Sequence, residues 1–394
     1  MYKIRTFNQI SQTGLDRFSD SEFIITPNPT EASAYLLRSH KLEIDDLHIP
    51  QLRAIARAGA GTNNVPIQNC TKKGIVVFNT PGANANAVKE LVLCGMLLAS
   101  RGVVPGINFA SAQQSSAEYS SLAKLMEAEK KRFKGTEIAG KTLGVIGLGA
   151  IGSLVAEMAL SLGMKVQGFD PALSVEAAWR LSSDVKRIEN LKTLAGSSDF
   201  ITLHMPVLEA TRGLIDAEIF ASMQPSACLL NFARDEIVDS KALLFALESN
   251  QLRKYVTDFP RPELLNKENV ISMPHIGAST IEAEENCAIM AADQLTDFLR
   301  NGNIKNSVNF PQISLDRDID TNQNKRLTIS NKNLPKTLGQ ILTVLSDQNL
   351  NVVDMINKSR DEIAYNLIDL EISPKPDTVK TIAAIENVTK VTLI

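Results

Sequence analysis

Short apolar runs alternate with amphipathic stretches along most of the chain, and this alternation predicts strands and helices in turn. The clearest example begins with an apolar, partly β-branched run at Thr142–Ile146, which a glycine-rich turn follows. Apolar residues at helical spacing then occupy Ile151–Leu162, and a second apolar run follows at Lys165–Phe169. Because each crossover helix packs back onto the sheet, this order predicts an α/β fold with a doubly wound parallel sheet.

The pattern extends in both directions from this stretch. Residues 1–95 also alternate strands with helices, which predicts a small α/β unit of its own, and an apolar helix at Val88–Ala99 leads out of it. Further strands are predicted at Phe200–Leu203, Cys228–Phe232, Tyr255–Asp258 and Val270–Met273.

The last part of the chain has a different order of elements. Residues 309–325 turn polar and predict a linker. Beyond it, strands and helices follow in the order βαββαβ, which is the ferredoxin-like plan. The predicted elements are the strands Arg326–Ser330, Val352–Lys358, Ile363–Ile372 and Val388–Ile394 and the helices Leu338–Gln348 and Val379–Ile385.

Composition narrows the class of protein. A length of 394 residues suits two or three domains, and a formal net charge of −3 gives no basic field for nucleic acid. No apolar run reaches about 18 residues and no secretion signal is present, so we expect a cytoplasmic protein without a membrane partner. The four cysteines are far apart, which predicts buried thiols and no metal site: Cys70, Cys94, Cys228 and Cys287.

The glycine-rich turn carries the first chemical signal. Gly147, Gly149 and Gly152 have the spacing of a dinucleotide-binding turn between a strand and a helix. Asp170 closes the second strand, where a carboxylate accepts hydrogen bonds from a ribose 2′-hydroxyl and repels a 2′-phosphate. The stretch therefore predicts NAD as the cofactor, in preference to NADP.

Polar residues follow the later strands at the edge where a parallel sheet binds its ligands. Arg234, Glu263 and His275 stand on successive loops after predicted strand ends. Oxidation of a 2-hydroxy acid needs a cation for the carboxylate and a base for the hydroxyl proton, and arginine and histidine suit these tasks. Glu263 would orient the imidazole. Taken singly, each of these residues is more often structural or solvated, so the prediction rests on the set.

A loop in the N-terminal unit is a second candidate for anion binding. Arg57 precedes a run rich in glycine and alanine, whose amides and single guanidinium suit an anion. The alternative is a surface charge beside an ordinary turn.

These residues lie in motifs that resemble those of the D-2-hydroxyacid dehydrogenases, and especially of the branch that acts on 3-phospho-D-glycerate. The motifs are RAGAGTNNV, GLGAIG, GFDP, HMPV, NFAR, VTDFPRPE and PHIGAST, in the family's order over nearly the whole chain. The resemblance implies NAD-dependent oxidation of 3-phospho-D-glycerate to 3-phosphooxypyruvate, the first step of L-serine biosynthesis. The alternatives are a dehydrogenase for glyoxylate, hydroxypyruvate, D-lactate or phosphoerythronate, and an NAD-sensing binding module without activity.

The resemblance also implies roles for individual residues. In the catalytic set, Arg234 binds the substrate carboxylate, His275 is the acid/base and Glu263 is its partner. Arg57, Ala60 and Gly61 join Arg234 at the substrate. The implied cofactor contacts are Gly147, Gly149, Ala150, Ile151, Gly152, Asp170, His204, Met205, Pro206, Thr211, Phe232, Ala233, Arg234, Asp258, His275, Gly277 and Ala278.

The family's architecture implies a discontinuous chain and a homodimer or homotetramer. A flavodoxin-like substrate domain, residues 1–97 and 277–308, would hold an inserted Rossmann-like NAD domain, residues 98–276. A linker at 309–325 would lead to an ACT regulatory domain at 326–394, with L-serine as effector at Asn331, Asn333 and Asn351. A domain that only dimerises is the alternative. Two departures stand out, because the family usually has glycine where Asp235 and Lys336 stand.

Overall fold

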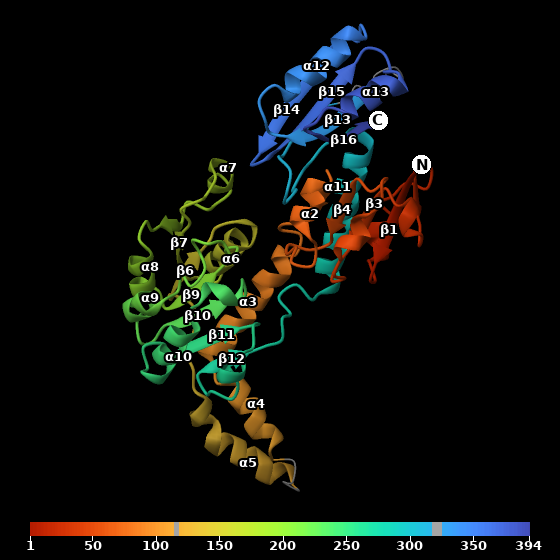
Figure 1. Cartoon of the computed structure of the whole chain (residues 1–394). Helices are drawn as coiled ribbons and strands as arrows, with labels where there is room; N and C mark the ends of the chain where they lie inside the picture. Colours follow the sequence, from red (N-terminus) through yellow and green to blue (C-terminus); the bar gives the residue numbers. More distant parts are fainter. Residues whose placement is uncertain (114–117, 317–324) are drawn as a thin grey trace. The chain divides into compact units, whose positions relative to one another are not determined.

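The structure, a computed structural model, describes residues 1–113, 118–316 and 325–394. Two compact units divide the chain (Figure 1): Met1–Asn84 with Ile281–Ile394, and Ala85–Thr280. Part of the expected linker, residues 317–324, lies outside the described residues.

The first unit begins with a five-stranded parallel sheet. Its strand order is β2-β1-β3-β4-β5, the order of flavodoxin-like sheets. Both faces are buried, one by α11 and α1 and the other by the chain around α2, so the central strands are apolar throughout. The elements are β1 Tyr2–Phe7, α1 Gln12–Leu15, β2 Phe23–Ile25, β3 Ala34–Leu37, β4 Ala54–Arg57, α2 Ile67–Lys72, β5 Val76–Phe78 and α11 Ile281–Asn301.

The C-terminal part of this unit is an antiparallel sheet with two helices. The strand order β14-β15-β13-β16 is that of the ferredoxin-like plan, and all six predicted elements are present. Their bounds are β13 Lys325–Lys332, α12 Thr337–Asp347, β14 Val352–Arg360, β15 Ile363–Leu370, α13 Pro376–Ala383 and β16 Val388–Leu393.

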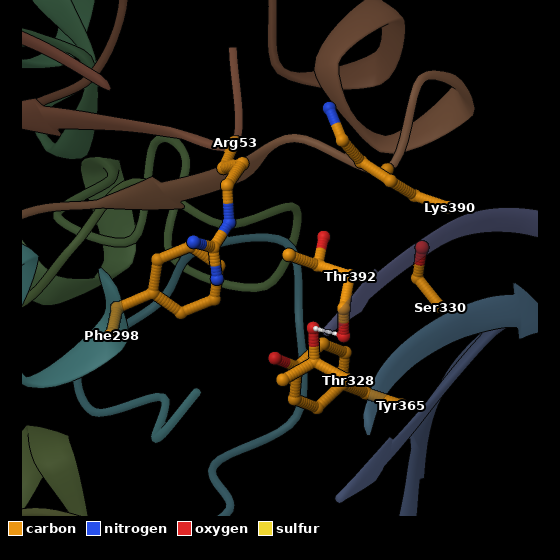
Figure 2. A pocket seen from close by; sticks show the side chains of 8 residues that line it. Arg53, Phe298, Thr328, Ser330, Tyr365, Lys390 and Thr392 are labelled. Carbon is orange, nitrogen blue, oxygen red and sulfur yellow. Dashed lines mark hydrogen bonds between the residues drawn. The ribbon is translucent and has the colours of Figure 1, made fainter. Parts of the chain in front are cut away.

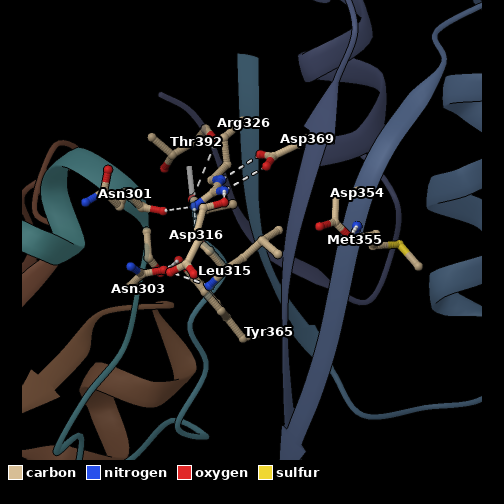
Figure 3. A network of polar contacts seen from close by, with 12 residues as sticks. Asn301, Asn303, Leu315, Asp316, Arg326, Asp354, Met355, Tyr365, Asp369 and Thr392 are labelled. Atoms are coloured by element: carbon tan, nitrogen blue, oxygen red, sulfur yellow. Dashed lines mark hydrogen bonds and ion pairs between the residues drawn. The ribbon is translucent and has the colours of Figure 1, made fainter. Parts of the chain in front are cut away.

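This antiparallel sheet shares a hydrophobic core with the five-stranded sheet. Ile363, Tyr365 and Leu367 of β15 belong to the same buried cluster as the apolar face of α11. A polar network lies beside this contact (Figure 3), in which the fully buried Arg326 forms a bidentate pair with Asp369. The same guanidinium donates to the carbonyls of Asn301, Leu315 and Asp316, and thereby fastens β13 to the end of α11.

The second unit is built on a seven-stranded parallel sheet of order β12-β11-β10-β9-β6-β7-β8. Helices α3 and α6 cover one face and α8, α9 and α10 the other, which confirms the predicted α/β fold with a doubly wound sheet. The strands are β6 Thr142–Ile146, β7 Lys165–Phe169, β8 Val185–Arg187, β9 Phe200–Leu203, β10 Cys228–Asn231, β11 Lys254–Thr257 and β12 Val270–Ser272. The helices are α3 Ala85–Ser100, α4 Val103–Ser111, α5 Tyr119–Glu129, α6 Ala150–Ser161, α7 Val175–Ala178, α8 Leu191–Ser197, α9 Ala217–Ser222 and α10 Ser240–Glu248.

Two helices of this unit bury none of their side chains. No residue of α4 or α5 is buried, although Val103, Ile107 and Tyr119 are large and apolar. Among the described helices, none is alone long and apolar enough to span a membrane. Helices α3 and α4 pass that test only as a pair, and they meet at a bend of 71°.

The prediction that all four cysteines are buried is wrong for Cys94. This residue lies on the outward face of α3, which does not pack against the sheet, and its side chain is exposed.

Candidate active site

The glycine-rich turn lies between β6 and α6. Gly147 adopts a φ of +89°, and a Cβ there would lie 2.5 Å from the carbonyl oxygen of His204. A Cβ on Gly152 would lie 1.9 Å from the carbonyl oxygen of Gly147, so the helix could not approach the strand. A Cβ on Gly149 would meet nothing within 4 Å, which leaves open space at the start of the helix.

The N-terminus of α6 offers the features of a dinucleotide site. Gly149 and Ala150 are exposed, so the helix end presents its partial positive charge to solvent. Asp170, at the end of β7, accepts hydrogen bonds from the backbone amides of Leu148 (2.8 Å) and Ala172 (2.9 Å). These two bonds fix the carboxylate beside the turn, where its remaining lone pairs suit the hydroxyls of a ribose.

The predicted catalytic residues follow three adjacent strands of this sheet. β10, β11 and β12 are parallel neighbours, and the residues after their last positions therefore leave at one edge. Arg234 follows β10, Glu263 follows β11 and His275 follows β12. Since neighbouring strands are about 4.8 Å apart, the ends of β10 and β12 lie roughly 10 Å apart.

The loop that carries Arg234 is held by a buried amide. Asn231 is fully buried, donates to the carbonyl of Arg234 (2.9 Å) and accepts from the amide of Ala233 (3.2 Å). The Arg234 guanidinium is half-buried and donates through Nη1 to the carbonyl of Ala233 (2.6 Å). Sequence reasoning did not single out Asn231, although it stands inside the motif NFAR.

The unusual Asp235 is neutralised by Arg261 from the next loop. Nε of Arg261 lies 2.7 and 2.9 Å from the two carboxylate oxygens, and Nη2 lies 2.5 Å from Oδ2. Hydrogen bonding to Asp235 raises the pKa of Arg261. Sequence reasoning missed this pair; opposite charges on loops after adjacent strands were the available signal.

His275 is exposed and packs against an aromatic ring. Its ring centroid lies 4.8 Å from that of Phe259 at an interplanar angle of 57°. In the part of the chain that the structure describes, no hydrogen bond joins Glu263 to His275; Oε1 of Glu263 instead lies 3.9 Å from Nη1 of Arg261. The expected partnership of Glu263 with the imidazole is therefore not formed in this conformation.

Asp258 offers a buried acceptor beside His275. It is 1% exposed, and its Oδ2 accepts the amide of Gly277 at 2.9 Å, which ties the β12 loop to the end of β11. Burial raises the pKa of Asp258, while the Gly277 amide and His275 oppose the shift. Oδ1 is buried and has no partner among the described residues, so it suits a donor such as the nicotinamide carboxamide. These features fit NAD.

The other predicted cofactor residues lie at the same edge of the sheet or on α6. His204, Met205 and Pro206 follow β9, next to the point where the strand order reverses. Thr211 fixes this loop, because its Oγ1 donates to the carbonyl of Pro206 (2.7 Å) and accepts from the amide of Leu208 (2.7 Å). The remaining members are Ile151 on α6, Phe232 and Ala233 after β10, and Ala278 after β12.

His204 gives a prediction about stability and pH. Nε2 lies 2.9 Å from Oγ1 of Thr202, and burial lowers the pKa of His204 to about 3. The unfolded chain binds a proton near pH 6.5 while the folded one does not, so stability falls as pH decreases below 6.5. We expect a loss of about 1–2 kcal/mol between pH 6.5 and 5, measured by urea unfolding, that His204→Asn does not show. An equal loss in both proteins would contradict this.

The predicted substrate residues of the N-terminal loop belong to the first unit. Arg57 ends β4 and donates through Nε to the carbonyl of Arg38 (3.0 Å). The carbonyl of Ala60 accepts from Asn79 (2.7 Å), and Gly61 follows in the same loop. The loop thus lies at the carboxyl edge of the five-stranded sheet, where ligands of such sheets bind.

The predicted effector residues do not converge within one chain. Asn331 is 3% exposed, and its Oδ1 accepts a hydrogen bond from Nδ2 of Asn366 (2.8 Å). Asn333 donates to the carbonyl of Asp361 (3.3 Å). Asn351 donates to Glu371 (3.2 Å) at the other end of the sheet. The register pairs both Lys325 and Val352 with Leu370, so Asn351 and Asn331 lie roughly 20 Å apart.

Comparisons with known proteins agree with this geometry. Residues 97–277 match the family model of the D-isomer specific 2-hydroxyacid dehydrogenase, NAD binding domain. The chain is 34% identical over 333 residues to D-3-phosphoglycerate dehydrogenase of Haemophilus influenzae, a match covering 82% of this chain and 76% of that protein. It is 33% identical over 362 residues to that of Methanocaldococcus jannaschii, covering 90% and 63%.

A solved structure of a 3-phosphoglycerate dehydrogenase is also similar to this chain. NAD+-bound 3-phosphoglycerate dehydrogenase of Entamoeba histolytica matches with a TM-score of 0.62 and 26% identity, over 78% of this chain and 98% of that one. The chain spans only 51–63% of the length of several of its curated relatives.

Proposed function

Since the chain belongs to the D-isomer specific 2-hydroxyacid dehydrogenase family, we propose that it oxidises 3-phospho-D-glycerate to 3-phosphooxypyruvate with NAD, the first step of L-serine biosynthesis. The observation that carries the proposal is the placement of Arg234 and His275 at the same edge of one sheet as the glycine-rich turn. The names of the curated relatives support the choice of a phosphorylated substrate.

Each residue of the site has a task in this reaction. Arg234 pairs with the substrate carboxylate through two charge-assisted hydrogen bonds. His275 takes the hydroxyl proton while the hydride leaves C2, so the alcohol becomes a carbonyl. NAD, when bound, accepts the hydride. Asp258 holds the β12 loop and offers Oδ1 to the carboxamide.

We propose the same division of labour between domains that the family has. Residues 98–276 bind NAD, and residues 1–97 with 277–308 bind substrate, to which Arg57, Ala60 and Gly61 contribute. Residues 326–394 are an ACT domain. The unburied helices α4 and α5 support a homodimer or homotetramer, because their exposed apolar side chains would be covered by a second copy.

Serine regulation is a further part of the proposal. Because Asn331 and Asn351 lie at opposite ends of one sheet, an effector that touches both must lie between two copies of the C-terminal domain. The rate of NADH formation at millimolar L-serine tests this, with glycine as the control amino acid. An unchanged rate would leave a domain that only dimerises.

A substrate panel tests the proposed activity. NADH formation is followed with 3-phospho-D-glycerate, phosphoerythronate, D-lactate and glycolate at equal concentrations. The proposal expects the highest kcat/KM with 3-phospho-D-glycerate. Preference for an unphosphorylated acid would indicate a sister dehydrogenase, and NAD binding without turnover on any acid would indicate a binding module.

The Asp235–Arg261 pair gives a prediction about substrate affinity. Arg261→Met leaves the Asp235 carboxylate uncompensated beside Arg234, where it competes with the substrate carboxylate. We expect KM to rise about tenfold, roughly 1.4 kcal/mol, with a smaller change in kcat. The double variant Arg261→Met/Asp235→Asn should regain most of the lost affinity. An unchanged KM in Arg261→Met, or no recovery in the double variant, would sink this assignment.

A further inference from the structure

A pocket lies inside the first unit, where the antiparallel sheet packs against the five-stranded sheet and α11. Its cavity volume is about 10 Å³, room for one water-sized sphere, and residues of both parts line it (Figure 2). The N-terminal part contributes Arg53, Gly74 and Phe298, and the antiparallel sheet contributes Thr328, Ser330, Tyr365, Lys390 and Thr392. The proposed oxidation uses none of them.

Two cationic side chains line this pocket. Arg53 is 7% exposed and packs its guanidinium over the ring of Phe298, with 5.4 Å from Cζ to the ring centroid. Its Nη2 is buried and has no hydrogen-bond partner in the described residues. Nζ of Lys390 donates to the carbonyl of Leu52. Within residues 1–113, 118–316 and 325–394, no carboxylate lies within 4.0 Å of either cation.

The two charges destabilise each other. Burial and, to a lesser extent, the charge of Arg53 together lower the pKa of Lys390 to about 8. A buried cation without a counter-charge is costly, and a pair of them more so. A negative group between them would remove this cost.

A hydroxyl completes the set of donors. Ser330 is 3% exposed, and its Oγ has no partner among the described residues. Two of the other three hydroxyls are engaged, since Thr328 donates to the carbonyl of Thr392 (3.5 Å) and Tyr365 to that of Gly302 (3.0 Å). The backbone closes the pocket at Gly74, where a Cβ would lie 2.7 Å from Oγ of Ser330.

We propose that this pocket binds a chloride ion through Nη2 of Arg53, Nζ of Lys390 and Oγ of Ser330. Charge-assisted hydrogen bonds from buried donors are strong, and an anion supplies the charge that the pocket lacks. Arg53 belongs to the N-terminal part, whereas Ser330 and Lys390 belong to the antiparallel sheet. The anion therefore bridges the two and strengthens their docking.

Thermal unfolding of the full chain tests the proposal. Sodium phosphate and sodium chloride are titrated separately, with ionic strength held constant by sodium gluconate. Chloride should raise Tm saturably by about 2–4 °C, whereas phosphate, which is too large for a cavity of about 10 Å³, should not. Lys390→Met and Ser330→Ala should raise the half-saturating concentration at least about tenfold. Lys358→Met, an exposed lysine on β14, is the matched control and should behave as the wild type.

Ser330→Ala is included because it should fold even if Lys390→Met does not. The Ser330 hydroxyl has no hydrogen-bond partner among the described residues, so its removal breaks no hydrogen bond. A half-saturating concentration equal to that of the wild type in Ser330→Ala overturns the site. A rise in Tm that never saturates also overturns the site. So does a rise that is the same in the wild type, Lys390→Met, Ser330→Ala and Lys358→Met. These outcomes are independent of the dehydrogenase assay.

Discussion

Replacing His275 with alanine should lower kcat for the proposed oxidation of 3-phospho-D-glycerate by about 10²–10⁴-fold, the usual contribution of a general acid/base. In the second unit, His275 is the exposed histidine at the edge of the sheet, whereas the ring of His204 is held by Thr202. Without the imidazole, the hydroxyl proton must pass to water while the hydride leaves. The initial rate of NADH formation at saturating substrate measures the effect.

The control for this variant is cofactor binding. The glycine-rich turn, Asp170 and Asp258 remain, so the Kd for NAD in His275→Ala should stay within about threefold of the wild type. His48→Ala removes an exposed histidine of the first unit and should leave kcat unchanged. Turnover of His275→Ala equal to that of the wild type would refute the assignment of the base.

The central βαβ unit was predictable because its local signals agree. The strands at Thr142–Ile146 and Lys165–Phe169 have the predicted bounds, and the helix between them starts one residue earlier than predicted. Glycine spacing, apolar period and the acidic residue all specify the same turn. Strand ends then follow from the parallel order of the sheet, which is why Arg234 and His275 could be placed at one edge.

Contacts between loops could not be predicted in the same way. The pairing of Asp235 with Arg261 depends on two loops meeting after adjacent strands, and sequence gives the strands without the conformations of the loops. The same limit applies to Glu263, which was expected beside His275 and lies nearer to Arg261.

In the C-terminal sheet, the order of the elements was predictable from the sequence, whereas their packing was not. Its βαββαβ order follows from periodicity, but periodicity does not predict that the sheet shares a core with the N-terminal part. Every residue of β15 from Ile363 to Leu370 is buried, because helices cover one face and the N-terminal part covers the other. Lys336, where the family has glycine, keeps a left-handed φ of +73°. A residue with a side chain adopts this conformation at some cost in strain.

The network at this junction carries the largest expected effect on stability. Asp369→Ala should lower the free energy of unfolding of the first unit by about 3–5 kcal/mol, because it leaves the fully buried Arg326 guanidinium without its carboxylate. The three carbonyls that Arg326 also contacts cannot neutralise its charge. Urea unfolding followed by circular dichroism measures the loss.

A surface pair provides the matched control. Asp377→Ala removes an exposed carboxylate that lies 3.3 Å from Lys380 on α13, and should cost less than about 1 kcal/mol. The double variant Arg326→Met/Asp369→Leu should recover part of the loss, since apolar side chains of similar volume need no counter-charge. If Asp369→Ala is no less stable than Asp377→Ala, the buried pair does not hold the antiparallel sheet to α11, and the shared hydrophobic core alone accounts for the docking.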